Sequence, residues 1–173
     1  MSPTVHRALR VAMLLVLAGG VGLGIHRLRR SEDQLELTRY VERDLPPLIA
    51  EESAIADQLS RLMREKTITA PDARKQLVDE VNPRIVSLRH RAEALQPKTI
   101  TVRELAGEYL RVVDAWAEAT RAAVRAIDDP KLPQEAGLVS VRERLDEAAQ
   151  ASRTFSGHVV STCRMHRLAP PVR

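Results

Sequence analysis

The chain has 173 residues, with 27 Lys or Arg against 23 Asp or Glu, and a formal net charge of +4. Apolar residues make up 44% of it and charged residues 29%, a composition that folds and that excludes a wholly disordered chain. The single cysteine, Cys163, excludes an intrachain disulfide framework and a cysteine-rich zinc module, so packing must hold the fold together.

The excess positive charge is confined to the N-terminal segment. Residues 1–30 carry five basic residues and no acidic one, whereas the rest of the chain carries 22 basic and 23 acidic residues. The five are Arg7, Arg10, Arg27, Arg29 and Arg30. A body so close to neutral disfavours nucleic-acid binding, and we expect no nucleic-acid partner.

An uncharged run lies between these basic flanks: residues 11–25 read VAMLLVLAGGVGLGI. A helix over this run is about 22 Å long, and beginning it at Ala8 extends it to about 27 Å, close to the roughly 30 Å hydrocarbon core of a bilayer. We therefore predict that residues 1–30 form an uncleaved membrane anchor, with the lipid bilayer as a partner. A secretory signal cleaved near residues 18–20 is the main alternative, and a buried core helix is a further one.

The orientation of this anchor follows from its position. The basic flanks nearly balance, but only ten residues precede the apolar run, and a signal-anchor of that kind leaves its short tail in the cytoplasm. We predict a single-pass protein of a bacterial inner (cytoplasmic) membrane whose bundle faces the periplasm or cell exterior. Secretion after signal cleavage is the alternative location.

Beyond residue 30, apolar residues recur with helical periodicity in blocks separated by proline and capping sequences. The expected helices cover 32–66, 70–96, 101–128 and 133–166, in a domain of residues 31–168 followed by a tail of 169–173. The proline pair at 46–47 should break or kink the first helix. No alternating strand pattern is present. The sequence predicts an all-α fold, an antiparallel up-down four-helix bundle with coiled-coil-like packing.

The helix expected over 101–128 has the clearest pattern, with apolar residues at eight successive heptad positions. Two of them, Tyr109 and Trp116, are expected in the core. Thr101 and Glu104 have the spacing of a capping box at its start.

The other blocks carry similar signals. Thr69 has the position of an N-cap, followed by a proline and an aspartate in the first turn. The buried stripes of the second and fourth helices are expected to include Val78 and Leu138.

Glu52 is the one polar residue on the apolar stripe of the first helix. Three interpretations remain open: a buried acid paired with His90 or His158, a polar core residue that fixes register, or a side chain that the nearby prolines rotate into solvent.

The sequence lacks the motifs of phosphate, dinucleotide, zinc-peptidase and serine-hydrolase sites. We expect no enzymatic activity and no cofactor. Cys163 and His166 share a helix face at a spacing that suits two metal ligands, and Glu52 and His90 would have to complete the site. The favoured interpretation is that Cys163 is a small buried hydrophobe and His166 a cation at a helix end, so no metal site is predicted.

The Cys163-x-x-His166 pair near the chain end resembles the haem end of the cytochrome c′ and b562 families, in which a histidine near the terminus binds iron. The covalent C-x-x-C-H motif is absent. A b562-like site needs a methionine at the start of the first helix, whereas Met63 falls near that helix's end. A small haem- or metal-binding bundle that uses His166 is the alternative function.

A basic tail follows the last acidic residue, Glu147. In an up-down bundle, Arg164, Arg167 and Arg173 should lie beside the N-terminal arginines and form a collar against anionic lipid headgroups. A solvated tail is the alternative.

These features predict a non-enzymatic, membrane-anchored interaction or sensory module, with a protein partner or a homodimer. Its outline resembles the four-helix ectodomains of bacterial chemoreceptors and sensor kinases. No second span or cytoplasmic signalling region follows in this sequence, so we expect a signal to pass through a partner or through dimerisation along the anchor. A ligand- or lipid-binding bundle is a third interpretation, which depends on a cavity in the core.

Overall fold

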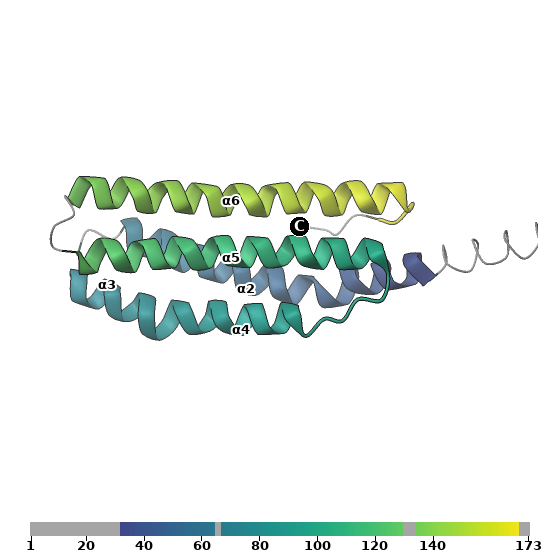
Figure 1. The fold of residues 1–173 in the computed structure, drawn as a ribbon, viewed down its shortest axis with the longest axis horizontal. Helices are drawn as coiled ribbons and strands as arrows, with labels where there is room; N and C mark the ends of the chain where they lie inside the picture. Colours follow the sequence, from purple (N-terminus) through teal and green to yellow (C-terminus); the bar gives the residue numbers. More distant parts are fainter. Residues whose placement is uncertain (1–31, 65–66, 130–133, 170–173) are drawn as a thin grey trace, which may run out of the picture.

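The computed structural model describes residues 32–64, 67–129 and 134–169. All regular structure in these residues is helical, with no strand among them, which confirms the all-α prediction. Figure 1 shows an elongated molecule in which the chain runs back and forth along its long axis. The predicted membrane anchor over residues 1–30 lies outside the described residues. Among those that are described, no helix is long and apolar enough to cross a bilayer.

The first helical segment contains the expected interruption at the proline pair. Residues 32–39 are helical, η1 (Tyr40–Asp44) is a π-helical turn, and α2 spans Pro46–Arg64. A proline has no N–H and its ring clashes with the carbonyl four residues earlier. The wider turn adapts the chain to this constraint: the Leu45 amide donates to the Tyr40 carbonyl five residues back, at 2.8 Å.

The second segment uses the same device before Pro83. It consists of α3 (Ala70–Gln76), the π-helical turn η2 (Leu77–Val81) and α4 (Asn82–Glu93). The π-turn inserts one residue into the helical register, so Leu77 is buried and Val78 is 36% exposed. The expectation that Val78 belongs to the buried stripe is therefore wrong.

The N-cap of α3 agrees with the sequence. The Thr69 hydroxyl accepts a hydrogen bond from the Asp72 amide at 3.3 Å and donates to the Asp72 carboxylate at 2.6 Å. These bonds satisfy one of the amides that a helix start leaves free.

The third helix, α5, spans Ile100–Asp128, close to the predicted range, but it does not begin with a capping box. Its N-cap residue makes no side-chain cap bond. Instead, the Glu36 carboxylate of the first segment accepts hydrogen bonds from the backbone amides of Lys98 and Thr99, each at 2.6 Å. Thr101 lies inside the helix and donates to the Asp33 carboxylate at 2.9 Å. The predicted cap is therefore wrong, because the helix already begins at Ile100 and the Thr101 hydroxyl is bonded to Asp33.

The last helix, α6 (Gln134–Met165), packs along α5 over most of its length (Figure 1). A Schellman motif ends it: the Arg167 amide donates to the Arg164 carbonyl at 3.1 Å, and the Leu168 amide donates to the Cys163 carbonyl at 2.8 Å. Arg167 has a φ of +57°, a left-handed conformation that glycine adopts at lower cost.

The core is aliphatic and continuous along α2, α4, α5 and α6. Tyr109 and Trp116 are buried in it, as expected for the heptad positions of α5. Tyr109 also contacts Phe155 of α6, with ring centroids 5.3 Å apart. Leu138, which was expected on the buried stripe of α6, is 49% exposed. That expectation is wrong, because the start of α6 borders a gap between helices.

Candidate functional site

A buried carboxylate joins three helices in the middle of the bundle. Glu52 of α2 is 8% exposed, and its Oε1 accepts the indole N–H of Trp116 on α5 at 3.1 Å and the hydroxyl of Ser152 on α6. Neither His90 nor His158 pairs with it: the ring of His90 faces Glu93, and that of His158 contacts Glu108. Of the three interpretations of Glu52, pairing with a histidine is wrong, because an indole and a hydroxyl contact it instead, and rotation into solvent is wrong, because it is buried.

Two buried phenols lie in the same region of the core. The buried hydroxyl groups of Tyr40 and Tyr109 have no hydrogen-bond partner within the geometric limits. Burial, together with the negative charge of Glu52, raises the pKa of Tyr109 well above its usual range. Burial also raises the pKa of Tyr40, with a contribution from Asp44. The two phenols stay protonated, and the Glu52 carboxylate is hydrogen-bonded to the Trp116 indole. These groups therefore fit a structural role, in which polar contacts in the core join the helices.

The residues considered as metal ligands do not come together. Cys163 is fully buried in the core, whereas the side chain of His90 is 74% exposed on α4. Glu52 is engaged by Trp116, and His166 is a half-buried residue just beyond α6. Across residues 32–64, 67–129 and 134–169, no three His, Cys, Asp or Glu side chains are placed to hold a metal ion.

Cys163 has the environment of a core residue. Burial raises the pKa of its thiol, which keeps it protonated and poorly reactive. His166, the residue on which the haem alternative depends, contributes its backbone carbonyl to a 3.0 Å hydrogen bond from the Gln34 side chain. Met63 lies at the far end of α2, at the opposite pole of the bundle from His166.

Polar bonds bring three segments together at one end, which we call the N-terminal end. It comprises the start of the first segment, the start of α5 and the C-terminal end of α6. The bonds are those of Glu36 to the amides before α5, of Asp33 to Thr101, and of Gln34 to the His166 carbonyl. Burial of the Glu36 carboxyl group opposes its ionisation, but the hydrogen bonds that it accepts from the Lys98 and Thr99 amides outweigh this effect, and the pKa of Glu36 is lowered.

The same end carries exposed apolar side chains. Leu35 and Ile100 are each 71% exposed and Met165 is 68% exposed, the highest values for large apolar residues in the described part of the chain. We call these three residues the apolar triad. Arg164 and Arg167, two of the three C-terminal arginines expected in a basic collar, are exposed at this end; Arg173 and the arginines of residues 1–30 lie outside the described residues. Sequence periodicity did not reveal the triad, because its members come from three segments.

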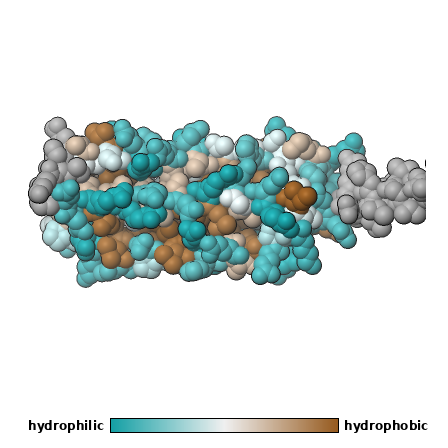
Figure 2. All heavy atoms as spheres, viewed as in Figure 1, coloured by the Kyte–Doolittle hydropathy of each residue, from teal (hydrophilic) through white to brown (hydrophobic). Residues whose placement is uncertain are grey.

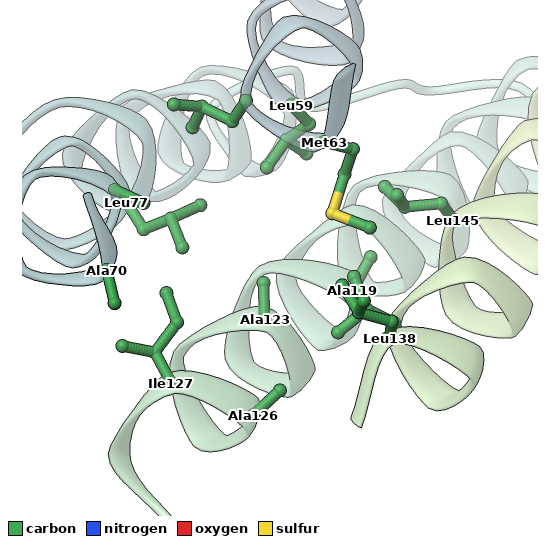
Figure 3. Close-up of a pocket in the computed structure, with 13 residues that line it drawn as sticks. Leu59, Met63, Ala70, Leu77, Ala119, Ala123, Ala126, Ile127, Leu138 and Leu145 are labelled. Carbon is green, nitrogen blue, oxygen red and sulfur yellow. The ribbon is translucent and has the colours of Figure 1, made fainter. Parts of the chain in front are cut away.

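A cavity of about 300 Å³ lies at the opposite end of the bundle. Among the described residues, thirteen line it, contributed by α2, α3, η2, α5 and α6, and all thirteen are apolar. Figure 3 shows side chains from these elements directed into one space; those labelled include Met63 of α2, Leu77 of η2, Ala119 and Ala123 of α5, and Leu138 of α6. The cavity meets the condition on which the ligand-binding interpretation depends.

Small side chains on facing helices create this cavity. Ala119, Ala123 and Ala126 of α5 line it across from Ala70 and Ala73 of α3. Larger residues stand at its margin, where Leu138 is 49% and Met63 39% exposed. On the face seen in Figure 2, hydrophobic residues are visible among hydrophilic ones chiefly over the half of the bundle that contains α3. An alanine at a heptad position looks like ordinary core in a sequence, so the cavity was not predictable residue by residue.

Comparison with known proteins adds no assignment. No family model, no curated protein and no solved structure matches this chain.

Proposed function

We propose that the chain is a membrane-anchored, non-enzymatic helical bundle that works as an interaction or sensory module at the outer face of a bacterial inner membrane. One observation carries the proposal: the apolar triad of Leu35, Ile100 and Met165 is exposed at the end of the bundle where residue 32 enters it. The uncharged run at 11–25 lies upstream in the sequence, separated from residue 32 by the basic segment 26–31. Apolar side chains exposed at such a place are suited to contact with the lipid interface.

The chemistry of this end supports the same arrangement. Exposed Arg164 and Arg167 beside the triad give a surface with both apolar and basic groups. Basic residues near an anionic bilayer surface each add about 1 kcal/mol to association. In this proposal the bundle stands on the membrane in an up-down arrangement, and it signals through a protein partner or through dimerisation along the anchor.

Cysteine accessibility in native membranes tests the contact with lipid. Full-length Ile100→Cys should react at least five-fold more slowly with a water-soluble maleimide in membranes than after detergent extraction. Val86→Cys, on the exposed face of α4 (46% exposed), is the matched control and should react equally in both. The native Cys163 contributes little, because it is buried. Equal rates for the two variants in membranes would exclude contact of this end with the bilayer.

The anchor itself needs a separate measurement. The protein should stay with membranes through an alkaline carbonate wash, and its intact mass should include residues 1–30. Release by carbonate, or a mass that begins near residue 20, would instead indicate a cleaved signal. Reporter fusions at the C-terminus then determine the orientation, and a visible absorption spectrum with metal analysis of the same preparation tests the haem alternative at His166.

A further inference from the structure

We propose that the cavity between α2, α3, α5 and α6 binds a small, uncharged, apolar molecule, such as a short alkyl chain or a fused-ring hydrocarbon. The proposal deepens the sensory function described above, because it names the class of ligand. It does not need the membrane anchor in order to be true. A cavity whose described lining residues are all apolar can bind its ligand whether the protein is anchored or secreted.

The size of the cavity limits the ligand. At about 300 Å³, it has roughly twice the volume of an apolar protein cavity that is known to take up benzene. It also lies at the lower limit of ordinary ligand pockets. A chain of about six to eight carbons fits this space, whereas a diacyl lipid does not.

The lining defines the chemistry of the ligand. Among the described lining residues, every side chain is hydrocarbon apart from the thioether of Met63, so none of these side chains can pair with a carboxylate, an amine or a hydroxyl. A buried charge without a partner is strongly disfavoured. Methionine adapts its shape to different apolar ligands, and its partial exposure beside Leu138 places these two side chains at the mouth of the cavity.

The gap results from side-chain size and not from misaligned helices. α5 and α6 pack closely along their length, and the buried alanines Ala119 and Ala123 leave the space open. A leucine at position 123 would fill part of it. The substitution is a suitable test, because it reduces the space without removing a charge or a hydrogen bond.

The experiment titrates the full-length protein, in lipid nanodiscs and with methyl-labelled alanine, with 1-bromohexane. The methyl signals of Ala119, Ala123 and Ala126 should shift saturably, while that of Ala50, exposed on α2, should not. Ala123→Leu should weaken binding at least ten-fold, as followed by the two remaining cavity alanines. Ala50→Leu, the matched control, should bind as the parent protein does.

A second arm tests the ligand class. 6-Bromohexanoate, which has the same chain length and a negative charge at neutral pH, should bind at least ten-fold more weakly than 1-bromohexane. Equal binding of the two would overturn the assignment to uncharged molecules. Shifts that do not saturate, or that persist in Ala123→Leu, would mean that the probe only partitions into lipid. Shifts that depend on protein concentration without any probe would assign the cavity to a second copy of the chain, which also overturns the proposal.

The outcome of the ligand titration does not depend on whether the protein is anchored in the membrane. A chain that fails the carbonate test can still bind 1-bromohexane, and an anchored chain can fail to bind it.

Discussion

Replacing Ala123 with leucine should stabilise the bundle, although it enlarges a residue that is only 8% exposed. Enlarging a well-packed core residue is normally destabilising, because neighbouring side chains must move. At this position the added isopropyl group enters the cavity that the Ala123 methyl borders (Figure 3). The expected sign is therefore the reverse of the usual one.

The magnitude follows from the added atoms. Burying three more carbons at about 0.8 kcal/mol each is favourable by roughly 2.4 kcal/mol. Fixing the leucine side chain costs about 0.5–1 kcal/mol of rotamer entropy. The net gain in the free energy of unfolding is about 1.5 kcal/mol, which for a domain of this size raises Tm by roughly 5 °C.

Circular dichroism at 222 nm during thermal and urea unfolding measures the change. Ala148→Leu is the matched control, since Ala148 of α6 is fully buried and does not line the cavity. The same added atoms should there cost about 1–3 kcal/mol through overpacking. If the two variants are destabilised alike, position 123 has no space for the leucine, and the reasoning fails.

Three further predictions concern polar groups and the backbone. Glu52→Ala should lower the free energy of unfolding by about 2–5 kcal/mol, since it opens a gap and removes the acceptor of the Trp116 indole. Glu52→Gln keeps an acceptor and should lower that free energy by less than about 1 kcal/mol. Urea unfolding measures both, and equal losses in the two variants would contradict this explanation. Arg167→Gly should gain about 0.5–1 kcal/mol by relieving the left-handed backbone, and an unchanged urea midpoint would contradict this. The free energy of unfolding of the parent protein should exceed that of Glu36→Gln by about 1 kcal/mol at neutral pH. Because the folded pKa of Glu36 is lowered from 4.5, that advantage is complete above the unfolded value and disappears as the pH falls through the folded one; an advantage that persists at pH 2 would refute the assignment.

The sequence predicted elements that depend on local patterns and missed those that depend on contacts between segments. The heptads of α5 and the Thr69 cap were predictable because each arises within a few consecutive residues. The proline pair at 46–47 indicated an interruption but not its form, and the π-turn before Pro83 shifts the buried position from Val78 to Leu77. Hydropathy alone cannot show such a one-residue insertion.

The site features were less accessible from sequence for the same reason. Glu52 stood out as a polar residue on an apolar stripe, but its partners come from two other helices and are far away in the sequence. The Glu36 carboxylate that receives the amides before α5 is more than sixty residues from them. Neither pairing leaves a mark in local composition.

The two ends of the bundle differ in what holds them together, and this difference accounts for the position of the cavity. At the N-terminal end, hydrogen bonds tie the first segment to both α5 and α6. At the other end, α3 has no buried residue, and its contact with α5 includes the exposed Arg74–Asp128 ion pair, at 2.6 Å. Exposed ion pairs contribute little to stability, and an alanine side chain reaches too short a distance to draw α3 against α5. The small facing residues therefore leave an apolar space between the helices at this end, away from the polar contacts that hold the N-terminal end together.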